Sequence, residues 1–162
     1  MIRSKKPIST ATAMSRLEAL CSRSEQCTGE ARKKLANWGI NHNDAEQIVA
    51  SLVQRRFIDD RRFCRAFVRD KVMFAHWGRR KITLSLIQKR LDRDIISEAL
   101  DDIDENEYLA ILKKIVLAKA KTIVDAETYD GRTRIFRFAV SRGFEPALVS
   151  NVIREIAAGN AH

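Results

Sequence analysis

The chain has 162 residues, of which 45% are apolar and 31% are charged, a composition typical of a folded, water-soluble domain. It contains no 18-residue apolar run, and residues 1–12 lack the apolar core of a signal peptide, which argues against membrane-spanning and secreted proteins. Its three cysteines, Cys21, Cys27 and Cys64, show no C-x-x-C spacing, which argues against a disulfide framework. We therefore expect a reduced, cytoplasmic protein.

Positive charge is concentrated in the middle of the chain. The 30 basic and 21 acidic residues give a net charge of +9, and residues 55–93, with 13 basic and 4 acidic side chains, account for the same excess of 9. The rest of the chain is balanced, with 17 residues of each sign. A positive middle between balanced flanks indicates an anionic partner.

The apolar spacing is helical along nearly the whole chain, and no stretch shows the sustained alternation of a strand. In the first third, Thr28 is placed to cap a helix that ends at Gly39. Asn43 and Glu46 then have the spacing of a capping box, which predicts the start of another helix.

The middle third predicts three further helices. One runs from about Asp60 to Phe74 and stops near Gly78, the next runs through Arg80–Lys89, and Asp92 can cap a third.

The last third continues the helical pattern. Asp104 precedes a long helix through Lys121, Gly143 ends the following helix, and Pro146 suits the first turn of the last one.

Three segments share one apolar pattern when they are aligned on Ile40, Leu91 and Phe144, which are 51 and 53 residues apart. The shared positions lie nine and five residues before each anchor and five, eight, nine and twelve residues after it: Ala31, Leu35, Ala45, Ile48, Val49 and Leu52; Ile82, Leu86, Ile96, Ala99, Leu100 and Ile103; Ile135, Ala139, Val149, Val152, Ile153 and Ile156. A unit of this length is marginal alone, so neighbouring units should support one another. The pattern predicts an elongated all-α array of three tandem three-helix repeats, with a flexible tail at 1–10 and repeats at 11–57, 58–103 and 104–162.

Two adjacent carboxylates, Asp59 and Asp60, lie within the basic stretch RRFIDDRRFCRAFVRDK and are candidates either for metal and acid–base chemistry or for helix capping. Asp59 precedes the first residue of the predicted helix, and Asp60 lies in its first turn, where carboxylates satisfy backbone N–H groups and face the positive end of the macrodipole. The three histidines, His42, His76 and His162, show no metal-ligand spacing, and no nucleotide-binding or nucleophile motif occurs. We interpret both aspartates as structural caps and expect no catalytic residue, no metal, no cofactor and no enzymatic activity.

The same helix places aromatic and basic side chains on opposite sides. The aromatic stripe contains Phe63, Phe67, Phe74 and Trp77. Its position favours core packing over stacking on nucleic-acid bases, and Cys64 beside it is expected to be a small buried residue.

The stretch RRFIDDRRFCRAFVRDK, followed by WGRRKITLSLIQKRL, resembles the core of the RecX family of bacterial recombination regulators. The matching positions are Phe57, Ile58, Asp59, Asp60 and Phe63, then Gly78, Lys81, Ile82 and Leu86; upstream, Leu35, Gly39 and Ile40 fit the pattern of the family's first unit. The resemblance covers residues 12–103 well and the third unit loosely. Three positions depart from the family pattern: Cys64 replaces alanine, Arg79 stands where proline is frequent, and Arg90-Leu91 replaces Gly-Ile.

The resemblance implies tandem three-helix repeats and a non-enzymatic modulator of RecA. Members of the family bind the RecA filament on single-stranded DNA and limit its growth, ATP turnover, strand exchange and co-protease activity, and some also bind DNA directly. By this resemblance we expect a RecA regulator that acts in DNA repair, homologous recombination and the SOS response. We also expect a monomer whose direct DNA binding is indifferent to sequence, with no membrane partner.

Basic side chains of the middle segment are the candidates for contact with the filament or with DNA: Arg61, Arg65, Arg69, Arg79, Arg80, Lys81, Lys89 and Arg90. Arg61, Arg65 and Arg69 follow one another at i, i+4 and i+8 on the side opposite the aromatic stripe. Contacts from such residues would fix position on phosphates or on an acidic protein surface without reading sequence.

A helix-turn-helix transcription regulator is the alternative function, because short helices joined by tight turns can form such units. That function needs an exposed recognition helix with side chains that read bases. The helix at Arg80–Lys89 offers Gln88 among the apolar residues Ile82, Leu84, Leu86 and Ile87, a composition that favours packing.

Overall fold

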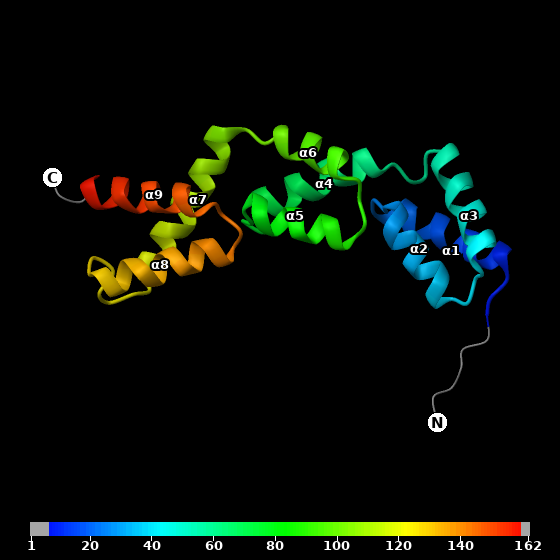
Figure 1. Cartoon of the computed structure of the whole chain (residues 1–162), viewed down its shortest axis with the longest axis horizontal. Helices are drawn as coiled ribbons and strands as arrows, with labels where there is room; N and C mark the ends of the chain where they lie inside the picture. Colours follow the sequence, from blue (N-terminus) through cyan, green and yellow to red (C-terminus); the bar gives the residue numbers. More distant parts are fainter. Residues whose placement is uncertain (1–6, 160–162) are drawn as a thin grey trace, which may run out of the picture. The chain divides into compact units, whose positions relative to one another are not determined.

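The computed structural model describes residues 7–159, which form nine α-helices and contain no strand. The helices are α1 (Thr10–Arg23), α2 (Thr28–Asn37), α3 (His42–Gln54), α4 (Asp60–Met73), α5 (Arg79–Gln88), α6 (Arg93–Asp101), α7 (Glu105–Lys121), α8 (Tyr129–Ser141) and α9 (Pro146–Gly159) (Figure 1). The predicted all-α fold is confirmed. None of the helices in this part of the chain is long and apolar enough to span a membrane.

The N-terminal tail was predicted to cover residues 1–10, of which 1–6 lie outside the described residues. Helix α1 already begins at Thr10, because the Ser9 side chain accepts a hydrogen bond from the backbone N–H of Thr12 at 3.1 Å. At the next cap, Thr28 is the first residue of α2 and Cys27 is its N-cap. Helix α3 is capped by Asn41, whose side chain accepts from Asp44 N at 2.9 Å, rather than by the predicted pair further along the chain.

The chain divides into two compact units, and the middle repeat contributes to both. The first unit contains Met1–Ala66 and Leu86–Ser97. In it, α3 packs on α1 and α2, which lie beside it in Figure 1. Its core includes Ala13, Leu17, Ala31, Leu35, Ile48, Leu52 and Ile58.

The second unit contains Phe67–Ser85 and Glu98–His162. Helices α7, α8 and α9 pack against one another in pairs. Tyr108 of α7 and Phe144 of the α8–α9 turn are both fully buried, with ring centroids 5.1 Å apart. Aromatic pairs at this separation gain stability beyond the area that they bury.

Burial confirms the repeat read from apolar spacing. The anchors Ile40, Leu91 and Phe144 are buried. The residues nine before, five before and eight after each anchor are also buried: Ala31, Ile82 and Ile135; Leu35, Leu86 and Ala139; Ile48, Ala99 and Val152. The chain is therefore built of tandem three-helix repeats. The boundaries at 11–57, 58–103 and 104–162 stay a prediction, because the two compact units divide the chain elsewhere.

Each anchor follows a residue with a left-handed backbone, and the same two hydrogen bonds close each turn. In the first, the amide of the left-handed residue donates to the carbonyl three residues earlier. Gly39, Arg90 and Gly143 have φ of 80°, 61° and 98°. The amide of each anchor donates to the carbonyl five residues earlier: Ile40 to Leu35 at 3.0 Å, Leu91 to Leu86 at 3.3 Å and Phe144 to Ala139 at 3.3 Å. These are Schellman motifs, which normally place glycine where the second repeat has arginine.

Arg90→Gly is therefore expected to stabilise the protein by about 0.5–1 kcal/mol. Relief of left-handed strain, about 1–2 kcal/mol for a residue with a Cβ, outweighs the extra entropy that glycine gives the unfolded chain. Urea denaturation followed by circular dichroism measures the change. Arg93→Gly, in the first turn of α6, is the matched control and should destabilise; a loss of stability for Arg90→Gly would contradict the strain argument.

Candidate functional site

The two adjacent aspartates begin α4 but serve different helices. Asp59 Oδ1 accepts a hydrogen bond from Arg62 N at 3.1 Å, as an N-cap does. That bond lowers the pKa of Asp59. Among residues 7–159, no group of three or more histidines, cysteines and acids is arranged to hold a metal ion.

Asp60 lies in the first turn of α4, but its carboxylate faces the start of α2. Asp60 Oδ1 accepts from Thr28 N at 2.8 Å and Oδ2 accepts from Thr28 Oγ1 at 2.7 Å. Cys27, the N-cap of α2, makes no side-chain cap of its own. Asp60 therefore caps a helix 32 residues earlier in the chain, a role that no local spacing could have indicated.

The side of α4 that enters the core is not the aromatic stripe. The buried residues of α4 are Cys64, Val68 and Val72, whereas Phe63 and Phe67 are half-buried. Phe74 follows the helix and is 80% exposed, so the prediction that it packs in the core was wrong. The burial expected for Cys64 is correct, and it raises the pKa of its thiol to about 11.

Arg61, Arg65 and Arg69 lie at i, i+4 and i+8 on α4 and are all exposed. Three guanidinium groups along one helix face form a row with a repeat of about 6 Å. This α4 arginine row is an exposed part of the predicted contact surface.

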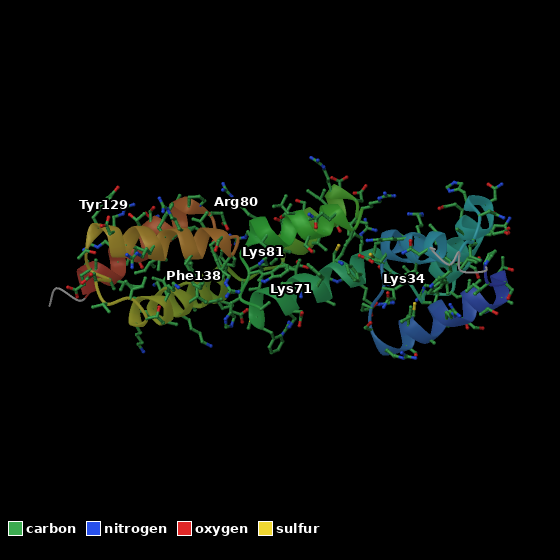
Figure 2. The ribbon with its side chains drawn as sticks, turned by 90° about the horizontal axis from the view of Figure 1, so that it is seen from below. Lys34, Lys71, Arg80, Lys81, Tyr129 and Phe138 are labelled. Carbon is green, nitrogen blue, oxygen red and sulfur yellow. The ribbon has the colours of Figure 1, made fainter. Side chains whose placement is uncertain are left out.

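Trp77 lies among cations rather than on an open surface. The ammonium group of Lys81 is 4.4 Å and that of Lys71 is 4.9 Å from the centroid of the Trp77 ring, and Phe67 meets the same ring edge-on at 6.4 Å. Both lysines are labelled in Figure 2, in the middle of the chain. A base that stacked on the ring face covered by either lysine would have to displace a cation–π contact of about 0.5–2 kcal/mol.

Arg79, predicted to contact the partner, is instead held inside the second unit. Its Nη1 pairs with Glu145 Oε2 at 2.7 Å and its Nη2 pairs with Glu105. Its guanidinium lies over the Tyr108 ring, 3.9 Å from the centroid, and the side chain is 23% exposed. We therefore leave Arg79 out of the contact surface.

The hydroxyl of Tyr108 completes this cluster, because it accepts from Arg79 N at 3.0 Å and donates to Glu145. Burial, together with the hydrogen bond to Glu145, raises the pKa of Tyr108. The hydroxyl therefore keeps the proton that it donates.

Lys89, another predicted contact residue, pairs with Glu30 of α2 at 2.9 Å, and each side chain is 27% exposed. This hydrogen bond lowers the pKa of Glu30 from its ordinary value of 4.5. The ion pair joins the turn of the second repeat to the second helix of the first repeat.

The stabilising effect of Lys89 should depend on pH. Because the folded-state pKa of Glu30 is lowered, its contribution is complete above pH 4.5 and is lost as the pH falls through the folded-state pKa. We expect the stability difference between wild type and Lys89→Met to narrow between pH 6 and pH 3, measured by urea denaturation. Lys114→Met, at an exposed position of α7, is the control; a difference that does not change with pH would contradict the assignment.

The remaining predicted residues differ in exposure. Arg80 is exposed and extends away from the ribbon in Figure 2. Arg90 is exposed and lies in the turn between α5 and α6. Lys81 is half-buried against Trp77. The exposed candidates are thus Arg61, Arg65, Arg69, Arg80 and Arg90.

The helices that carry these residues match a known sequence domain. The model of the domain described as "RecX, second three-helix domain" matches residues 59–100, which contain α4, α5 and most of α6. Two curated relatives named "Regulatory protein RecX", from Clostridium botulinum strains Alaska E43 and Eklund 17B, are 32% and 30% identical to the chain over 130 and 129 residues. The chain belongs to the RecX family.

The similarity extends over most of this RecX-family chain. Each alignment covers 78% of the chain and 59% of the relative, so the chain spans less than two thirds of the length of the relatives that it matches. The crystal structure of RecX from Lactobacillus salivarius superposes with a TM-score of 0.79 at 18% identity, covering 90% of this chain and 95% of that one. This structural likeness supports the tandem-repeat fold, and the curated relatives are named as regulators.

The second repeat of this RecX-family chain also exposes apolar side chains that were not predicted from the sequence. Met73 and Phe74 follow the arginine row, and Leu84 and Ile87 lie on α5. On a helical wheel of α5, Leu84 and Ile87 lie on a different side from Ile82 and Leu86. This separation could have predicted from the sequence that Leu84 and Ile87 are exposed.

Proposed function

We propose that this RecX-family chain binds RecA filaments on single-stranded DNA through its second repeat and restrains their growth, ATP hydrolysis, strand exchange and co-protease activity. The α4 arginine row, Arg61, Arg65 and Arg69, is the observation that carries the proposal. Family membership suggests the class of partner. Residues 55–93 hold the chain's entire net positive charge, so we expect the partner surface to be negatively charged.

The row supports contact with a repeating anion. Phosphates and acidic side chains are bound by arginine through charge-assisted hydrogen bonds, which need no base sequence. A regulator held in this way would occupy successive sites along a filament and obstruct the addition or rearrangement of subunits there. No catalytic step is required, because bound protein shifts the filament equilibrium according to its differential affinity for the two states.

Replacing Arg61, Arg65 and Arg69 together with alanine should weaken filament binding about 10–100-fold at physiological salt. The slope of log affinity against log salt should fall by about 2, since each lost single-strand phosphate contact contributes about 0.7. Fluorescence anisotropy of preformed filaments, titrated with the protein at several salt concentrations, measures both effects.

The matched control is the triple alanine substitution of three exposed arginines on α8, Arg132, Arg134 and Arg137, which removes the same charge from the third repeat. This control should reduce binding much less, and both variants should keep the helical signal of the wild type. Equal losses for the two variants would show that net charge, not the row, governs binding.

A further inference from the structure

Helix α5 has two apolar faces, of which one is in the core. Ile82 and Leu86 are fully buried. Leu84 and Ile87, three residues apart on another side of the helix, are 62% and 38% exposed. A surface helix normally presents polar side chains to water, and a second apolar face indicates that a further surface covers it.

The charge of α5 restricts what can cover that face. The helix, RRKITLSLIQ, contains three basic residues and no acid. Arg80 lies one turn before Leu84 and is exposed, so Arg80, Leu84 and Ile87 follow one another at i, i+4 and i+7. This spacing is how a single helix presents anchors to a groove. The complementary groove is apolar along its floor and acidic at the end that receives Arg80.

A nucleic acid fits this face poorly. Phosphates give Arg80 a partner but leave Leu84 and Ile87 without apolar contacts, and apolar wedges between bases are a device of duplex minor-groove binders. A protein surface can supply both an acidic group and an apolar recess, and leucine-rich helix faces are a common means of protein recognition.

We propose that the α5 face formed by Arg80, Leu84 and Ile87 docks into an apolar, acid-rimmed groove of a partner protein, while the α4 arginine row contacts the phosphate backbone. The inference rests on the proposed function, in which that protein is RecA itself. The second repeat then has two contact surfaces: α5 binds the protein of the filament, and the α4 arginine row binds the phosphates of its DNA.

The test compares three probes: RecA without DNA, a single-stranded oligothymidylate, and the filament that the two form. Leu84→Ser with Ile87→Ser is the test variant, and Leu117→Ser, at a leucine of α7 that is 45% exposed, is the matched control. Because Leu84, Ile87 and Leu117 are all exposed, the melting temperatures of both variants should stay close to that of the wild type, as measured by circular dichroism.

We expect the double variant to lose at least tenfold in affinity for RecA and for the filament, with its affinity for the oligonucleotide within twofold of wild type. Unchanged filament binding, or an equal loss with the oligonucleotide, would overturn the assignment of the α5 face while leaving the proposed function intact. Wild-type protein that binds neither RecA nor the filament would instead overturn the proposed function, and this inference with it.

Discussion

Gly78→Ala is expected to lower the free energy of unfolding by about 3 kcal/mol. A Cβ at this position would lie 2.2 Å from the carbonyl carbon of Gly143 and from the amide nitrogen of Phe144, and backbone cannot move aside as a side chain can. The approach is held by hydrogen bonds from Gly78 N to Arg142 O at 2.8 Å and from Arg80 N to Gly143 O at 3.0 Å. Overpacking of this kind costs about 1–3 kcal/mol, and lost hydrogen bonds add to it.

Gly159→Ala is the matched control, since among residues 7–159 no atom beyond its own stretch of helix lies within 4 Å of the position that a Cβ would take at Gly159. That substitution should leave stability unchanged or raise it slightly, because alanine has the higher helix propensity. Urea denaturation of the two variants and the wild type, read by circular dichroism, gives the comparison. A Gly78→Ala protein as stable as the control would show that the two backbones do not meet as described.

The contact at Gly78 has a counterpart in the first unit, and both join successive repeats. There, a Cβ at Gly29 would lie 2.0 Å from the carbonyl oxygen of Lys89. Both glycines lie at the start of a repeat's second helix, and both meet the turn that precedes the last helix of the next repeat.

The caps at these joints also correspond. Thr28 N donates to Asp60 of α4, and Arg79 N donates to Tyr108 of α7. In each case the first helix of one repeat satisfies the second helix of the repeat before it. An N–H group that has no acceptor within its own helix is thereby used to join neighbouring repeats.

The sequence could predict the parts of this design that depend on local spacing. Helix positions and the repeat follow from apolar periodicity, and the burial of Ile40, Leu91 and Phe144 bears this out. The role of Asp59 follows from its place before α4. These features need only the nearest neighbours along the chain.

The partners of charged residues could not be predicted in the same way. Arg79 lies 66 residues from Glu145, and Lys89 lies 59 residues from Glu30. Composition alone therefore counts both cations as available to an anionic partner. Phe74 illustrates the opposite error, since its place on an aromatic stripe suggested burial although the chain leaves α4 just before it.

Arg79 and Arg80 are adjacent, but we expect alanine at Arg79 to lower mainly the stability and alanine at Arg80 to lower mainly the affinity for the filament. Arg79→Ala should cost about 2–3 kcal/mol of stability, because it leaves Glu145 and Tyr108 without their cation in a partly buried cluster. Arg80→Ala should change stability by less than about 0.5 kcal/mol, because its side chain is exposed.

Filament affinity should show the reverse order. Arg80→Ala removes the exposed cation of α5 and should weaken binding several-fold, whereas Arg79→Ala, measured at a temperature where it remains folded, should bind nearly as wild type. Urea denaturation and filament anisotropy on the same preparations separate the two effects. If Arg79→Ala lost affinity while Arg80→Ala kept it, the guanidinium of Arg79 would have to leave Glu105 and Glu145 on binding, and the joint between the second and third repeats would then take part in recognition.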